Sequence, residues 1–204
     1  GEERLRQTTA GTHLGVFTVD GLESELEVPE ILTTIRTDIV LVIVHGDVAL
    51  WQARVDLTAL QGIEVRAHLL PSGFLLQGQP SSLLAASQLE VVAAVHPLPL
   101  AFMIDSQLTD ILAEAATMTD SSLISTAVQM NGWKESEMGT PLDHIRLGSL
   151  SSDLGVTAES FLVDHRQIDS GRHLGVLNLN DIPLVSADPA LSWLTLQPVW
   201  GLHN

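Results

Sequence analysis

A histidine that follows a Gly-Thr pair is the first candidate for chemistry in this chain. His13 lies in the string GTHLGV (11–16), and a histidine in such a setting can act as the general base of a Ser-His-Asp triad. A triad also needs an aspartate at the end of a buried strand and a serine that the histidine activates. Neither GTPL (139–142) nor GSLSS (148–152) matches a serine motif, and IDSG (168–171) follows a polar run. We therefore predict no catalytic residue, so that the chain is not an enzyme by itself.

The string around His13 has a near copy later in the chain. GRHLGV (171–176) shares five of its six residues with GTHLGV. Both copies continue with strand-forming residues, as HLGVFTV and HLGVLNL. We interpret His13 and His173 as residues at the start of two similarly built strands.

Metal binding is the second candidate chemistry. Seven possible donors lie close together in the sequence: Asp164, His165, Asp169, His173, Asn178, Asn180 and Asp181. Histidine and carboxylate groups suit divalent ions, but this spacing matches neither an EF-hand nor another ligand motif. We predict a solvated polar loop and no metal. A metal-dependent hydrolase that uses residues 164–181 stays open as an alternative.

No cofactor is predicted either. The chain has no GxxxxGK[ST] or GxGxxG loop to hold phosphate groups. Its one lysine, Lys134, has no neighbours that recommend it for Schiff-base chemistry.

Charge and hydropathy argue against two kinds of partner, nucleic acid and a membrane-spanning environment. The 204 residues include 25 acidic and 9 basic side chains, a formal net charge of −16, which repels a phosphate backbone and argues against nucleic acid. The longest purely apolar run, IVLVIV (39–44), is far shorter than the roughly 20 residues of a membrane-spanning helix. Because cysteine is absent, thiol catalysis and disulfides are excluded.

Residues 36–104 show the clearest element pattern. DIVLVIVHG reads as a buried strand, DVALWQARVDLTALQ as a helix capped by Asp47, and IEVRAHL (63–69) as a half-buried strand. FLLQG returns as a strand, PSSLLAASQ is a short helix opened by Pro80, and VVAAV is the last strand. The order strand-helix-strand-strand-helix-strand predicts a ferredoxin-like, split βαβ arrangement.

Two detailed expectations concern which side chains face the core of this module. Helical spacing predicts a buried stripe of Val48, Trp51, Val55 and Ala59, widened by Leu50, Leu57 and Leu60. Strict alternation in 63–69 predicts two faces of one strand. Ile63, Val65, Ala67 and Leu69 form the apolar face, and Glu64, Arg66 and His68 form the polar face.

The rest of the chain divides around this module. Residues 1–35 are an acidic lead-in with one strand, 105–120 form a connecting helix, and 121–204 form a second module. TPLDHIRLGSLSSDLG (140–155) is weakly helical. IPLVSADPALSWLTLQPVWGL can be laid on GFLLQGQPSSLLAASQLEVVAAV, which matches Leu184 and Val185 to Leu75 and Leu76, Pro189 to Pro80, and Val199 to Val92. We therefore predict an α+β fold of two tandem ferredoxin-like (βαββαβ-type) modules with antiparallel sheets.

The segment LQGIEVRAHLLPSGFLLQGQPSSLLAASQLEVVAAVHPLPLAF (60–102) resembles the inhibitor-type propeptide domains that precede subtilisin-like (S8 family) serine proteases. The ending IPLVSADPALSWLTLQPVWGLHN is similar to the end of such a domain. The resemblance implies a ferredoxin-like module whose open sheet packs on two helices of the protease. It also implies a C-terminal tail that lies in the substrate cleft like a product.

The resemblance implies a function that consists of binding. The tail Gly201, Leu202, His203 and Asn204 would fill the cleft, with Asn204 nearest the catalytic serine of the protease. We therefore expect a prosegment that is chaperone and inhibitor of a subtilisin-like catalytic domain, in its own precursor or in a separate chain, secreted or at the cell surface. The alternative is a tandem ferredoxin-like regulatory module that binds a ligand or a partner at a sheet edge.

Overall fold

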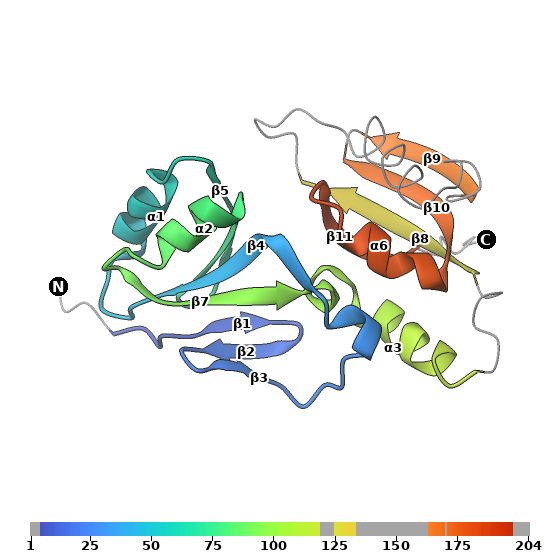
Figure 1. The fold of residues 1–204 in the computed structure, drawn as a ribbon, viewed down its shortest axis with the longest axis horizontal. Coiled ribbons are helices and arrows are strands. Elements are labelled where there is room, and N and C mark those ends of the chain that lie inside the picture. The colour runs from blue at the N-terminus through green and yellow to red at the C-terminus, as the bar shows by residue number, and fades with distance from the viewer. Residues whose placement is uncertain (1–4, 119–124, 134–162, 170, 198–204) are drawn as a thin grey trace, which may run out of the picture. The chain divides into compact units, whose positions relative to one another are not determined.

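The computed structural model describes residues 5–118, 125–133, 163–169 and 171–197 (Figure 1). Within them the fold is α+β, with antiparallel sheets and short helices. The chain divides into two compact units. Unit 1 comprises Gly1–Glu27 and Thr34–Phe102, and unit 2 comprises Val28–Thr33 and Met103–Asn204.

The main sheet of unit 1 has four strands in the order β5-β6-β4-β7, and all neighbours are antiparallel. Its elements follow in the expected order: β4 (Ile35–Val44), α1 (Leu50–Thr58), β5 (Ile63–Leu69), β6 (Gly73–Gly78), α2 (Pro80–Ala86) and β7 (Val92–Pro99). The apolar run in β4 is buried on both faces of the sheet, which explains why it lacks alternation. Pro80 occupies the first turn of α2, as predicted.

Helix α1 differs from its prediction at its start and in its buried face. It begins at Leu50 after Ala49, not at Asp47, because His45–Val48 closes a turn through the Val48 N–H and the His45 carbonyl (3.1 Å). Ala53 and Leu57 are its buried residues. The expected stripe is wrong for Trp51 and Val55, which are 69% and 54% exposed. It is confirmed for Leu57, which is buried, and for Val48, Leu50 and Leu60, which pack against the buried cluster that contains Leu57.

Helical spacing is compatible with two different apolar stripes on α1, and either could face the core. The stripe that faces the core contains three leucines. Leu57 belongs to the buried cluster, and Leu50 and Leu60 pack against that cluster. The buried face of α1 is therefore set by packing against the sheet and not by helical spacing alone.

Strand β5 has the predicted bounds, but a β-bulge breaks its alternation. The register shifts between Val65 and Ala67, so that Arg66 is the extra residue. Beyond the bulge His68 pairs with Phe74 and stacks on its ring (centroids 5.0 Å apart), on the same face as Val65. The prediction that His68 lies on the face opposite Val65 is therefore wrong. One inserted residue exchanges the two faces for the rest of the strand.

The N-terminal part of unit 1 forms a separate three-stranded meander: β1 (Ala10–Thr12), β2 (Gly15–Thr18) and β3 (Gly21–Glu23). His13 and Leu14 are the two-residue turn between β1 and β2, since Thr12 pairs with Gly15. Gly15 has φ +138°, and a Cβ there would lie 2.3 Å from the Glu23 carbonyl oxygen. In the second copy of the string, His173 is inside a strand. The expectation of two similarly built strands is therefore wrong.

Unit 2 contains a four-stranded antiparallel sheet in the order β11-β8-β10-β9. Its described elements are η1 (Glu30–Leu32), α3 (Ser106–Ala115), β8 (Ser125–Gly132), β9 (Val163–Asp169), β10 (Arg172–Asn178), η4 (Leu179–Asp181), α6 (Ile182–Ser186) and β11 (Leu191–Leu196), while η2 (Leu100–Met103) spans the boundary between the units. The helix expected over 105–120 is present as α3. Asp105 caps it by accepting a hydrogen bond from the Gln107 N–H (3.0 Å).

The end of unit 2 has the expected strand-helix-strand order, but the alignment that predicted it is out of register. Leu184 and Val185 lie in helix α6 rather than in a strand, and Pro189 follows the helix. Pro183, in the first turn of α6, is the counterpart of Pro80. The position matched to Val199 and the weak helix expected over 140–155 lie outside the described residues.

The two sheets share one topological feature. When the four strands of each sheet are numbered in chain order, the spatial order is fourth-first-third-second in both. In both, a helix that carries a proline in its first turn joins the third strand to the fourth. Of the helices in the described parts of the chain, none combines the length and apolarity that a membrane crossing needs.

Candidate functional site

Three histidines of unit 1, His13, His68 and His96, hydrogen-bond to main-chain carbonyl groups. His13 Nε2–H donates to the Ala101 carbonyl (3.2 Å), and its ring lies against Phe102 with centroids 5.6 Å apart. His96 Nε2–H donates to the Thr18 carbonyl (2.7 Å) and His68 Nε2–H to that of Pro71 (3.3 Å). These contacts attach loops and turns to the sheet, which is a structural use of the imidazole N–H group.

The seven donors considered for a metal ion are not all in the described part of the structure. The side chains of Asp164, His165 and Asp169 lie outside the described part of the structure. Lys134, considered above for Schiff-base chemistry, also lies outside it. Asn178 Oδ1 accepts a hydrogen bond from the Asn180 N–H (2.9 Å) and so caps the turn η4. Among the residues that the structure describes, no group of three or more histidine, aspartate or glutamate side chains is placed to hold a metal ion.

Asp181 is the described member of that set with a shifted ionisation. Burial raises the pKa of its carboxyl group above the ordinary value, because removal from water disfavours the charged form. His173 is fully buried within strand β10. The string GRHLGV therefore contributes buried residues to the core of unit 2.

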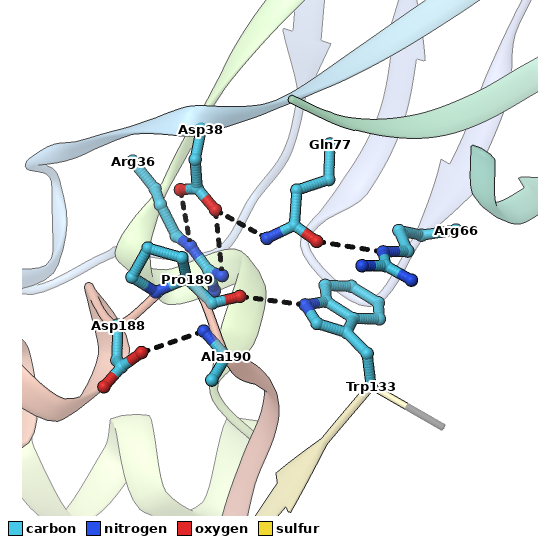
Figure 2. A network of polar contacts seen from close by, with 8 residues as sticks. All are labelled: Arg36, Asp38, Arg66, Gln77, Trp133, Asp188, Pro189 and Ala190. Atoms are coloured by element: carbon cyan, nitrogen blue, oxygen red, sulfur yellow. Dashed lines mark hydrogen bonds and ion pairs between the residues drawn. The ribbon is translucent and has the colours of Figure 1, made fainter. Parts of the chain in front are cut away.

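A polar chain crosses three strands of unit 1 (Figure 2). Arg36 donates to both carboxylate oxygens of Asp38, from Nε (2.9 Å) and from Nη2 (3.2 Å). Gln77 donates its amide N–H to Asp38 Oδ2 (2.8 Å) and accepts at Oε1 from Arg66 Nε (2.9 Å). The Arg36 side chain is 1% exposed and that of Asp38 19%. Because a buried guanidinium needs a compensating charge, Asp38 fixes Arg36 and holds the sheet together at this point.

Sequence reasoning missed this chain of residues, although a signal was present. Arg36 and Asp38 stand two positions apart on a strand and therefore share a face. Arg66 reaches Gln77 from the position of the β-bulge, which the alternation of apolar and polar residues did not reveal.

The sheet of unit 1 is covered on both faces, whereas the resemblance led us to expect an open one. Helices α1 and α2 pack on Val42 and Val44. The intervening residues Leu41 and Ile43 point to the other face and are also fully buried. Unit 1 therefore offers no open apolar sheet face to a partner.

The sheet of unit 2 has two different faces. Val128, Met130, Leu177 and Leu194 are buried on one of them. The other is called the amide face here: Leu174, opposite Gln129, is buried on it, and its remaining described side chains are half-buried or exposed. Besides Leu174, its residues include Ala127, Gln129, Asn131, Arg172, Val176, Trp193 and Thr195.

Hydrogen bonds order the amide face. Gln129 donates its amide to Asn131 Oδ1 (2.8 Å), and Asn131 Nδ2 donates to the Trp193 carbonyl (3.2 Å). Nearby in the same unit, Trp133 Nε1–H donates to the Pro189 carbonyl (3.1 Å) and the Ala190 N–H to Asp188 Oδ1 (2.8 Å) (Figure 2). The two amide side chains thus have fixed orientations on a flat strand surface.

The edge of the sheet at β11 is occupied. Ile104 forms a parallel bridge with Leu194, and the Asp105 N–H donates to the Leu194 carbonyl (2.9 Å). Beyond β11, the Gln197 N–H still bonds to the Ala127 carbonyl (2.9 Å). The predicted tail residues Gly201, Leu202, His203 and Asn204 lie outside the described residues.

No protein-family model matches this chain, and neither a curated protein nor a solved structure does.

Proposed function

We propose that this chain is a non-catalytic prosegment that assists the folding of a subtilisin-like serine protease and inhibits it, outside the cell or at its surface. Both units are then ferredoxin-like modules in tandem. Two features support this assignment: the fourth-first-third-second strand order of both sheets and the helix between the third and fourth strands of each. The resemblance of residues 60–102 to inhibitor-type propeptides suggests that the partner is a subtilisin-like serine protease.

The amide face of unit 2 is the observation that carries the proposal. In the implied complex a sheet face packs on two helices of the protease. Side-chain carbonyl groups such as those of Gln129 and Asn131 accept hydrogen bonds from the unpaired N–H groups at helix N-termini. Trp193 adds a large half-buried ring, a residue type that contributes strongly to binding when an interface desolvates it. Among the described residues, unit 1 has no sheet face of this kind, so we assign the docking role to unit 2.

Strand β11 connects this face to the inhibitory tail. The strand direction continues through Gln197, and the segment that ends with Gly201–Asn204 follows. An extended segment binds a protease cleft through main-chain pairing and through side chains that enter pockets. Face and tail together give two linked contacts, which raises affinity beyond that of either one.

Inhibition assays with the full chain test this proposal. A subtilisin-like protease is titrated with the chain, with a form that lacks Gly201–Asn204, and with the variant Ala127→Arg, which adds a long cationic side chain on the amide face. We expect each change to weaken inhibition at least about tenfold, because the first removes the cleft segment and the second blocks the face.

The matched control is Ala85→Arg, which makes the same change at an exposed alanine on helix α2 of unit 1. It should change inhibition less than about twofold, as expected for a surface substitution away from the interface. Equal inhibition by all four proteins, or no inhibition of any subtilisin-like protease, would reject the proposal.

A regulatory module that binds another kind of partner is the second candidate, and one observation favours it. Trp51 and Val55 on α1 and Leu84 on α2 are large apolar side chains that are more than half exposed. A prosegment that docks through its sheet does not use this helical surface. A thermal-shift screen with amino acids and nucleotides separates the two functions. A ligand that stabilises the chain, together with no protease inhibition, favours the regulatory module.

A further inference from the structure

One face of the unit 1 sheet is buried by something other than a helix. Side chains of β4 alternate between the two faces, and Val42 and Val44 join the cluster that contains residues of α1 and α2. Leu41 and Ile43 therefore point away from the helices, and each is 0% exposed.

The meander β1–β3 covers this second face. Gly73 is the cross-strand partner of Ile43, and a Cβ on Gly73 would come within 2.4 Å of the Ala10 Cβ. His96 is the partner of Leu41, and its ring lies 5.7 Å from that of Phe17. Directly opposed residues share a face, so β1 and β2 lie over Leu41 and Ile43.

The meander is attached to the sheet mainly through side chains. It forms a sheet of its own, which is not part of the four-stranded ladder. Ala10, Leu14 and Phe17 are buried within unit 1. Main-chain bonds also join this N-terminal segment to the rest of the unit. The Arg6 N–H donates to the Gly46 carbonyl (3.0 Å), the Gly11 N–H to the Leu70 carbonyl (2.9 Å), and the Ser72 N–H to the Thr9 carbonyl (3.0 Å).

The two ends of this element differ in how they are held. Arg6 anchors the N-terminal side, where its guanidinium donates to the Val48 carbonyl (2.6 Å) and to Ser72 Oγ (3.3 Å). The connection on the other side, residues 24–27, is exposed throughout. Exposed polar connections of this kind tolerate insertion and cleavage.

We infer that residues 5–24 form a displaceable cap, which closes the sheet face of unit 1 to protein partners in the way that a docked peptide would. This inference rests on the proposed function, because the partner kept out is the same protease surface that docks on unit 2. The face has the apolar character of a docking surface, with Leu41, Ile43 and Leu75 at its centre. Its occupant is the N-terminal segment of the chain, so only unit 2 is open to the protease.

The test uses the full chain with a protease cleavage site inserted between Ser24 and Glu27. After folding and cleavage, a fluorescent peptide of residues 5–24 is added. We expect the peptide to replace the native segment, seen as a rise in anisotropy, while the circular dichroism of the remainder is retained. Loss of the fold of unit 1 when the segment leaves would overturn the inference, because the meander would then be an integral part of the core.

Two peptide variants distinguish specific binding of the peptide at the cap position from nonspecific adhesion to the protein. Phe17→Ala removes a buried ring of β2, and Val16→Ala changes the neighbouring, exposed position of the same strand. We expect the first peptide to bind at least about tenfold more weakly than the unaltered one, and the second within about twofold. Equal binding by all three peptides would contradict the cap.

Protease binding then tests the role of the cap separately. We expect the uncleaved chain to bind one protease molecule and the chain freed of residues 5–24 to bind two, measured by sedimentation with an inactive protease. A stoichiometry that stays at one overturns the role of the cap as a gate. If neither form binds protease but the peptide still exchanges, the proposed function fails and the cap itself stands.

Discussion

At the scale of single residues, unit 1 depends on a buried charge. Arg36 is almost fully buried, and both oxygens of Asp38 accept hydrogen bonds from it. Gln77 donates a hydrogen bond to the same carboxylate and accepts one from Arg66 on a third strand. The network therefore stabilises the sheet by neutralising Arg36 as well as by joining strands.

Asp38→Asn should lower the free energy of unfolding by about 2–4 kcal/mol, because it removes the carboxylate charge that accepts two hydrogen bonds from the buried Arg36 guanidinium. Urea unfolding monitored by circular dichroism measures the loss. Glu90→Gln, the same kind of exchange at an exposed position of unit 1, should cost less than about 0.5 kcal/mol. Similar losses in the two variants would show that Asp38 does not compensate Arg36.

At the scale of elements, helix α1 shows how two possible apolar faces are resolved. Burial of Ala53 and Leu57 leaves Trp51 and Val55 in solvent. Both stripes are compatible with helical spacing, and the sheet beneath the helix decides between them. The position of each side chain on the helix is thereby a consequence of packing rather than of propensity.

Leu57→Ala should destabilise the chain by about 2–5 kcal/mol, since it removes apolar contacts and leaves a cavity. Val55→Ala, two positions earlier on the same helix, should change stability by less than about 0.5 kcal/mol, because the side chain is exposed and alanine favours a helix. Thermal and urea unfolding of both variants check this order. The opposite ranking would mean that the face containing Val55 is the buried one.

At the scale of the whole molecule, two sheets of the same strand order have different surroundings. The sheet of unit 1 is covered by helices on one face and by the meander on the other, while the described side chains of the amide face of unit 2, apart from Leu174, are half-buried or exposed. The chain as a whole carries a net charge of −16, from 25 acidic and 9 basic residues. Like charges at this density oppose the compact state.

Salt should therefore stabilise the folded chain. Between roughly 10 and 200 mM NaCl at pH 7 we expect the melting temperature to rise by a few degrees, because screening weakens the repulsion between carboxylates. Differential scanning fluorimetry measures the shift, and choline chloride at equal ionic strength should reproduce it. A melting temperature that falls with salt would show that attractive ion pairs outweigh the repulsion.

Local chemistry in the sequence determined the type and position of most described elements. The bounds of β5, the start of α2 at Pro80 and the helix that follows Asp105 could all be predicted, because alternation, proline at a first helical turn and an N-terminal cap act over a few residues. The net charge likewise argued against nucleic-acid binding, and the absence of cysteine excluded thiol chemistry.

Only the tertiary structure decided which faces are buried and what covers them. The bulge at Arg66 moved His68 to the other face, and the string around His13 became a turn while its copy around His173 became a strand. The cover over Leu41 and Ile43 comes from residues more than 20 positions away in the sequence. Such outcomes depend on contacts between distant segments, which no local pattern of residue types contains.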